Sequence, residues 1–190
     1  KESSYATSKI NGENFIKQTF DKYTILRPSL VYSVDDKFTT MLFTMLKMLP
    51  IFPIYYQGKT LFNPIHVTDM CEIIEKTILN EIKSQTIECI GPEEISFKNI
   101  IHRLLKSINI KRFLIPTPLI LAKIIASIFE ILMKNPFITN DQLNLLKHNN
   151  SPSGKFKTNI DLKLNTNLKL FDQEIAKYSY MWKEGGQYSK

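Results

Sequence analysis

The sequence predicts an α/β fold, and three observations lead to this prediction. Segments typical of strands alternate with segments typical of helices, which is the order found in folds built on a parallel sheet. The segment 23–32, YTILRPSLVY, is mostly apolar, as a strand covered on both faces would be. Of the 190 residues, 43% are hydrophobic and 11% are aromatic, so the chain can bury a sizeable core.

The first fifty residues are expected to form a helix, a strand and a second helix. Residues at three- and four-residue spacing predict a helix over 3–20, with a serine near its N-terminal cap. The strand 23–32 follows, and its regular pairing should loosen at Pro28, which has no backbone donor. The acidic pair at 35–36 then opens an apolar helix, FTTMLFTMLKML, which Pro50 ends.

Downstream, short strands are expected to alternate with helices. Asp69 stands where it can cap a helix over about 70–80, and Ser96 caps the helix that begins at Phe97. Thr139 and Gln142 have the spacing of a capping box. The other expected elements are strands at 61–67 and 86–90 and helices at about 118–134, after 139 and at 171–182.

The apolar run 119–133, LILAKIIASIFEILM, raises the question of a membrane helix. As a helix it would be about 22 Å long, shorter than the roughly 30 Å of hydrocarbon that a spanning helix crosses. Lys123 and Glu130 interrupt it on one face. We therefore expect a core helix, with a helix lying on a membrane surface or in a subunit interface as the alternative.

Composition and short motifs exclude several function classes. The net charge of +7 comes from 22 Lys and only 3 Arg, a bias typical of AT-rich coding, so we expect no nucleic-acid partner. Cys71 and Cys89 are expected to be small buried hydrophobes rather than a disulfide or metal ligands. The six glycines form neither a dinucleotide fingerprint nor a P-loop, and the opening residues do not form a signal peptide.

Tyr5 and Lys9 form the sharpest local motif. On a helix, this four-residue spacing puts the phenol and the ammonium on one face. A neighbouring cation favours the tyrosinate, so such a tyrosine can act as a general acid or base on an alcohol or carbonyl. The spacing is weak by itself, because roughly one such pair is expected by chance. Tyr55 and Lys59 form a second one, in a segment that resembles a loop.

The order of four segments supports a functional role for Tyr5 and Lys9: YATSKINGE, TILRPSLVYS, PIHVTDM and IECIGPEEISFKNII. Together they resemble the extended short-chain dehydrogenase superfamily, which contains nucleotide-sugar epimerases and dehydratases. Within it, MLKMLPIFPI, the hydrophobic helix at 116–134 and PFITNDQLNLLKHNN are most similar to an atypical branch. That branch contains the NAD(P)H-binding accessory subunit of respiratory complex I (NADH:ubiquinone oxidoreductase).

The resemblance implies a nicotinamide site, with NAD or NADP as the cofactor. It assigns Tyr5 as the acid/base or nicotinamide-side tyrosine and Lys9 as the ligand of the nicotinamide ribose. Pro28, Ser29 and Leu30 would follow the strand end that packs against the nicotinamide ring.

Four other positions of the family pattern are expected to be structural or altered. His66 is expected to be structural, Asp69 to cap a helix and Arg27 to form a supporting salt bridge. Ser33 stands where epimerases usually have glycine, which suggests a changed turn near the substrate.

In this family the glycine-rich turn that holds the pyrophosphate precedes the tyrosine helix. The resemblance therefore implies the C-terminal part of a Rossmann-type parallel sheet domain with a small, mainly helical substrate-side lobe. We expect the end of the Rossmann-type domain at 1–34, the lobe at 35–150 and a basic tail with one helix at 151–190. The helix and strand of 1–34 should then expose an apolar face that a missing N-terminal half or a partner subunit covers.

Two function hypotheses follow, together with a third in which the chain is a remnant without function. The first is a non-catalytic NAD(P)-binding accessory or assembly subunit related to complex I, located in the cytoplasm or peripheral to the inner membrane. The second is part of an NAD(P)-dependent enzyme that acts on a sugar nucleotide or similar substrate through Tyr5 and Lys9.

Overall fold

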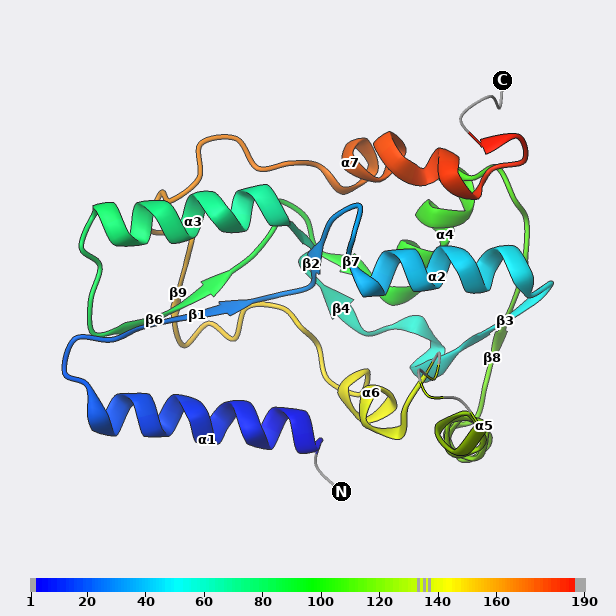
Figure 1. Cartoon of the computed structure of the whole chain (residues 1–190), viewed down its shortest axis with the longest axis horizontal. Helices are drawn as coiled ribbons and strands as arrows, with labels where there is room; N and C mark the ends of the chain where they lie inside the picture. The colour runs from blue at the N-terminus through cyan, green and yellow to red at the C-terminus, as the bar shows by residue number, and fades with distance from the viewer. Residues whose placement is uncertain (1–2, 133, 135, 137, 187–190) are drawn as a thin grey trace.

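A computed structural model describes residues 3–132, 134, 136 and 138–186, and Figure 1 shows their arrangement. In chain order the elements are α1 (Ser4–Thr19), β1 (Thr24–Pro28), β2 (Val31–Tyr32), α2 (Lys37–Met48), β3 (Ile51–Ile54), the 3₁₀ helix η1 (Tyr55–Gly58), β4 (Leu61–Phe62), β5 (Ile65–His66) and α3 (Val67–Leu79). They continue with β6 (Gln85–Cys89), β7 (Ile95–Ser96), α4 (Phe97–Ser107), β8 (Phe113–Pro116), α5 (Leu119–Leu132), α6 (Asn140–Leu145), β9 (Lys157–Thr158), α7 (Phe171–Tyr178) and the 3₁₀ helix η2 (Ser179–Trp182).

A parallel sheet between two helices confirms the predicted α/β class. Its strand order is β1-β6-β9, and Leu26 of β1 pairs with Ile87 of β6. In Figure 1, α3 lies on one side of β1 and β6, and α1 lies on the other side. Ile73 of α3 packs with Ile87 and Cys89 of β6 in one core cluster, so the α3 side is the buried side of the sheet.

The largest core lies in the other half of the molecule, where α2, α4 and α7 come together (Figure 1). Phe43 and Leu46 of α2 pack with Leu104 of α4 and with Phe171 and Ile175 of α7, and all five are buried. Two short strand pairs, β2 with β5 and β4 with β7, join this core to the three-stranded sheet. The apolar residues of α4 recur at helical spacing in the sequence, and they form the face that packs into this core.

Pro28 loosens the first strand as expected. Regular pairing of β1 with β6 ends at Pro28, and after a two-residue break β2 pairs with β5. The single strand expected at 61–67 is likewise two strands, because Asn63 and Pro64 separate β4 from β5 and each pairs with a different partner. The strands β3, β7, β8 and β9 were not predicted, since they have only two to four residues and pairing partners far away in the chain.

The core-helix interpretation of the apolar run is wrong. Helix α5 buries only Ala122 and Ala126, which pack in a small cluster with Tyr55 and Leu143. The large side chains point elsewhere: Ile131, for example, is 83% exposed. Leu119, Ile125 and Phe129 are half-buried, and the other large apolar side chains of α5 are exposed. No helix in the described part of the chain has both the length and the hydropathy needed to cross a bilayer.

Two local expectations also need correction. His66, not Asp69, is the N-cap of α3: its side chain accepts a hydrogen bond from the amide of Thr68, so the helix begins three residues earlier than expected. Cys89 is buried as predicted, and burial raises the pKa of its thiol to about 12. Cys71 is exposed, because it lies on the outer face of α3.

Candidate functional site

Tyr5 lies in the first turn of α1, and α6 fixes this turn in place. The Asp141 carboxylate accepts hydrogen bonds from the Ser3 hydroxyl at 3.0 Å and the Ser4 amide at 2.9 Å. It also accepts one from the Tyr5 amide at 3.4 Å. A carboxylate is stabilised at a helix N-terminus by the exposed amides and by the helix dipole. The tyrosine is thus positioned through its backbone, while its side chain is 57% exposed.

A second polar anchor holds the middle of α1 against β1. Glu13 and Arg27 form a bidentate pair with N–O distances of 2.8 and 2.5 Å, which confirms the supporting salt bridge expected for Arg27. The hydrogen bonds from Arg27 lower the pKa of Glu13. The guanidinium also lies 4.6 Å from the ring centroid of Phe156. Helix α1 is therefore held by polar contacts at two points, and none of its residues is buried.

Lys9 lies one turn after Tyr5 on the same side of α1. Its Nζ is 5.5 Å from the centroid of the Tyr5 ring, within the range of a cation–π contact. The structure therefore brings the predicted pair together, with the ammonium over the ring face.

The segment Pro28–Leu30 lies where β1 ends, beside the end of β6. The Ser29 amide donates to the carbonyl of Cys89 at 2.9 Å, and the Ser29 hydroxyl donates to the carbonyl of Asn150 at 2.7 Å. The same hydroxyl accepts a hydrogen bond from the amide of Asn63 at 3.0 Å. Ser29 thus fixes three chain segments at this strand end. Because its hydroxyl makes two hydrogen bonds within the protein, it has a structural task.

A cavity of about 630 Å³ opens at the carboxyl end of β1. Its wall includes Tyr5, Pro28, Ser29 and Leu30, so four of the five predicted site residues converge on one space, and Lys9 lies outside the wall. Helices α2 and α6 and the segment 148–150 contribute most of the remaining wall. Ligands of open parallel sheets bind in such crevices at the carboxyl ends of strands.

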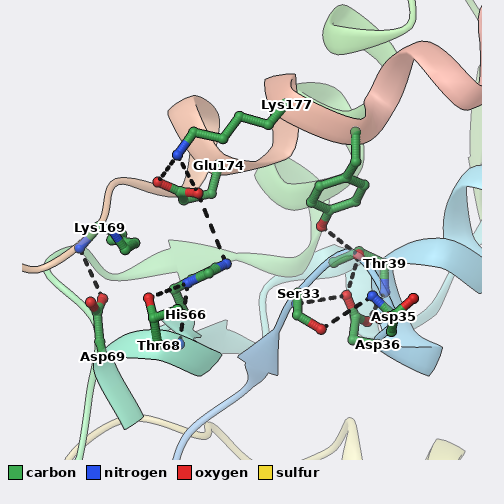
Figure 2. Close-up of polar contacts among 11 residues, drawn as sticks. Ser33, Asp35, Asp36, Thr39, His66, Thr68, Asp69, Lys169, Glu174 and Lys177 are labelled. Carbon is green, nitrogen blue, oxygen red and sulfur yellow. Dashed lines mark hydrogen bonds and ion pairs between the residues drawn. The ribbon is translucent and has the colours of Figure 1, made fainter. Parts of the chain in front are cut away.

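Figure 2 shows two neighbouring sets of polar contacts: His66 of β5 faces Glu174 of α7, and Asp69 of α3 contacts Lys169, two residues before α7. Asp69 accepts a hydrogen bond from the Lys169 amide at 2.9 Å, and burial raises the pKa of its carboxyl. His66 Nε2 lies 3.9 Å from Glu174 Oε2, and burial lowers the pKa of the imidazole. Glu174 is also paired with Lys177 at 2.7 Å. These contacts give His66 the structural role that we expected.

A separate cluster in Figure 2 explains the serine found in place of glycine. The Ser33 amide donates to Asp36 at 3.1 Å, and the Ser33 hydroxyl accepts from the amide of Asp35 at 3.2 Å. Asp36 is also the N-cap of α2 and is bonded to Thr39. Ser33 is absent from the described non-glycine residues with positive φ, so its backbone does not require glycine.

Two anchors of the site were not identified from the sequence. The sequence does place Asp141 in the first turn of α6, directly after the capping-box residue Thr139 and Asn140. It does not indicate the contact with α1, because that contact joins residues more than 130 positions apart. Asn150 contributes through its backbone carbonyl, for which side-chain patterns give no signal. Among the described residues, no group of three or more His, Cys, Asp or Glu side chains is arranged to hold a metal ion.

Comparison with known proteins supports the resemblance seen in the sequence, although no family model matches. The chain is 23% identical to the mitochondrial 40 kDa subunit of NADH-ubiquinone oxidoreductase from Neurospora crassa, over 94% of this chain and 45% of the relative. The chain therefore spans about half the length of the curated relative it matches.

Solved structures of nucleotide-sugar enzymes show the same fold. A dTDP-glucose 4,6-dehydratase from Streptomyces venezuelae, solved with NAD bound, matches with a TM-score of 0.57 at 14% identity, over 96% of this chain and 50% of that one. A dTDP-4-dehydrorhamnose reductase ortholog from Clostridium acetobutylicum matches with a TM-score of 0.56 at 16% identity, over 92% and 54%. The predicted Rossmann-type fold and the resemblance to extended short-chain dehydrogenases are confirmed.

Proposed function

We propose that this chain, which has the fold of the extended short-chain dehydrogenases, is the substrate-side part of an NAD(P)-binding accessory or assembly subunit related to complex I. One observation carries the NAD(P)-binding part of the proposal: Tyr5 and Pro28–Leu30 converge on one cavity at the carboxyl end of β1. The similarity to the 40 kDa subunit, which extends over 94% of this chain, supports the link to complex I.

The cofactor proposed for this site is NAD or NADP, held here only at its nicotinamide end. Pro28, Ser29 and Leu30 would lie along the nicotinamide ring, and Lys9 would donate to the ribose hydroxyls. Tyr5 would hold a proton at its phenol oxygen, next to the ring. When bound, the nicotinamide supplies or accepts a hydride. The free edge of β1 and the uncovered helix α1 fit a dinucleotide that reaches this cavity from a neighbouring sheet segment.

We propose that a dinucleotide-binding half covers α1 and extends the sheet at β1. On α1, Ile10, Phe15 and Phe20 are each more than half exposed. Strand β1 is at the edge of the sheet, and among the described residues its outer side has no strand partner. An exposed apolar helix next to an unpaired parallel strand is the surface that a further strand–helix unit would cover. The coding sequence upstream of Lys1 tests whether this half belongs to the same polypeptide: a strand followed by a glycine-rich turn supports that, and an in-frame stop would leave a partner subunit to supply it.

Assembly with complex I is the direct test of the accessory role. The chain, tagged at its C-terminus and expressed in its own organism, should migrate with the NADH-oxidising complex on a native gel. The matched variant Tyr5→Phe should migrate in the same way, because an accessory role does not require the phenol oxygen. Migration of the tagged chain away from the complex would contradict the proposal.

A peripheral position at the inner membrane is the location that we propose. On α5, Ile120, Ile124 and Ile128 lie one turn apart and are exposed, and Phe113 of β8 is 76% exposed. An apolar helix face of this kind can lie in the headgroup region of a bilayer. The double variant Ile124→Asp and Ile128→Asp should lose flotation with anionic phospholipid vesicles. The control Ile78→Asp, on the exposed face of α3, should keep it; equal flotation of both variants would refute this location.

An enzyme acting on an alcohol or carbonyl is the alternative, and the position of Tyr5 on the cavity wall favours it. In this case Tyr5→Phe would abolish turnover when the dinucleotide-binding half is supplied, and binding of the cofactor would persist. Under the accessory proposal, there is no turnover for this substitution to remove.

A further inference from the structure

The walls of the cavity contain no side chain with a fixed charge, as far as the described residues show. Side chains from four elements give the interior its apolar character: Phe38, Met41 and Met45 from α2, Phe52 from β3, Phe62 from β4 and Phe97 from α4. Apolar surface of this kind favours ligands that leave water easily.

Three aromatic rings lie together in this interior, and we call this group its aromatic end. The centroids of Phe38 and Phe62 are 6.2 Å apart, those of Phe38 and Phe97 6.4 Å, and those of Phe62 and Phe97 6.5 Å. Met41 and Met45 lie beside them on α2. Thioether side chains adapt to irregular apolar shapes, so this end can accept a chain or ring of variable form.

A phosphate-bearing ligand would find no guanidinium here. All three arginines are engaged elsewhere: Arg27 with Glu13, Arg103 with Glu93 at 2.8 Å, and Arg112 with backbone carbonyls of α2. Arginine is the residue best suited to bind phosphate in a bidentate manner. A diphosphate placed against these walls would lose its hydration without gaining a counter-charge.

The polar side chains at the cavity are uncharged, and several of them are already bonded within the protein. The Ser29 hydroxyl makes two hydrogen bonds, the Gln142 side chain closes the α6 capping box, and the Asn149 side chain accepts from the amide of Leu61. Within the described residues, the phenols of Tyr5 and Tyr55, the ring of His148 and the side-chain amide of Asn150 have no hydrogen-bond partner in the protein. The free polar groups are thus uncharged, and all but the Tyr55 phenol lie near α1, α6 and the 148–150 segment.

We propose that this cavity binds an elongated, uncharged apolar molecule: a hydrocarbon chain with one neutral polar head, such as a long-chain aldehyde or alcohol. The head lies at Tyr5 and the chain runs toward Phe38, Phe62 and Phe97. This inference deepens the proposed function and rests on it for the cofactor next to Tyr5. It assigns to the cavity a ligand class different from the sugar nucleotides named for the structural relatives.

The test uses the full chain and N-phenyl-1-naphthylamine, an uncharged probe whose fluorescence rises in apolar sites. Met45→Lys places a cation inside the cavity and should weaken probe binding at least tenfold. Met48→Lys is the matched control, because Met48 lies on the same helix, is 66% exposed and is not on the wall. It should leave binding unchanged, and dodecanol should displace the probe from the unmodified chain.

A second variant keeps the test valid if Met45→Lys fails to fold. Leu145→Arg changes a partly exposed wall residue of α6 and should also weaken probe binding, with the circular dichroism spectrum unchanged. Equal binding by Leu145→Arg and Met48→Lys would overturn the proposal, and so would displacement of the probe by UDP but not by dodecanol. Because the probe needs no cofactor, failure of NAD(P) binding alone would refute the proposed function and leave this inference standing.

Discussion

The substitution Gly91→Ala probes the junction on which the candidate site is built. Gly91 follows β6, and its amide donates to the carbonyl of Asn63 at 3.1 Å. A Cβ atom added to Gly91 would lie 1.6 Å from the carbonyl oxygen of Pro64 and 2.6 Å from its carbonyl carbon. Both are backbone atoms, so no side-chain rotation can relieve the clash. Alanine is therefore expected to push two backbone segments apart.

The size of the effect follows from the displacement required. Real Cβ contacts are not shorter than 3.0 Å, so the segments must separate by about 1.4 Å, the difference between 3.0 and 1.6 Å. This shift threatens the bond from Gly91 to Asn63, the bond from Asn63 to Ser29 and the 2.9 Å bond from Ile65 to Leu30. With about 1 kcal/mol for each of the three hydrogen bonds and about 1–3 kcal/mol for overpacking, we expect a loss of about 4–6 kcal/mol.

Urea unfolding followed by far-ultraviolet circular dichroism measures this loss, and Gly12→Ala is the matched control. A Cβ at Gly12 meets no atom within 4 Å, and Gly12 lies in the interior of α1. Alanine there should raise the free energy of unfolding by about 0.5–1 kcal/mol, because it restricts the unfolded chain. If Gly91→Ala costs less than about 1 kcal/mol, the close approach of β6 to the β4–β5 connection is refuted.

Three further predictions concern the anchors of α1 and the half-buried His66. Glu13→Gln should weaken the pair with Arg27 by about 1 kcal/mol or less, since the pair is partly exposed, and should speed hydrogen exchange of α1 amides; unchanged exchange would count against this anchor. Asp141→Ala should increase exchange mainly in the first turn of α1, while an effect confined to α6 would contradict its role in placing Tyr5. Because burial lowers the pKa of His66, the folded chain binds that proton less readily than the unfolded chain, so stability should fall as the pH drops below about 6.5. His66→Asn keeps a helix cap and should flatten this part of the stability–pH curve; an unaltered slope would assign it to other groups.

Much of the fold could be predicted because local signals and tertiary contacts agree. The apolar spacing of α4, the cap at Asp36 and the capping box at Thr139 each specify an element within a few residues. The short strands β3 and β8 could not be found in this way, because neither has a local signal strong enough and their pairing joins segments about sixty residues apart. The prediction of a core helix failed for α5. A high hydrophobicity shows that a helix tends to leave water, but it does not show whether this chain's own core, a partner or a membrane covers it.

In the candidate site, too, local motifs predicted some residues and missed the distant residues that hold them in place. The motif order indicated Tyr5 and Pro28–Leu30, and the structure places them around one cavity. Their supports were hidden, because the Asp141 carboxylate and the Asn150 carbonyl reach them from more than 120 residues away. The position of Asp69 before an apolar run predicts a helix cap. Its carboxylate instead binds the amide of Lys169, a contact that no local pattern encodes.

We propose that this chain holds only the nicotinamide end of NAD(P) and that a separate half holds the pyrophosphate. The most direct measurement is a fluorescence titration of NADH and NADPH with the chain alone and with the chain extended by the polypeptide encoded upstream of Lys1. We predict saturable binding by the extended protein, weakened by Lys9→Ala, and very weak binding by the chain alone. Tight binding by the chain alone, or none by the extended protein, would contradict the claim.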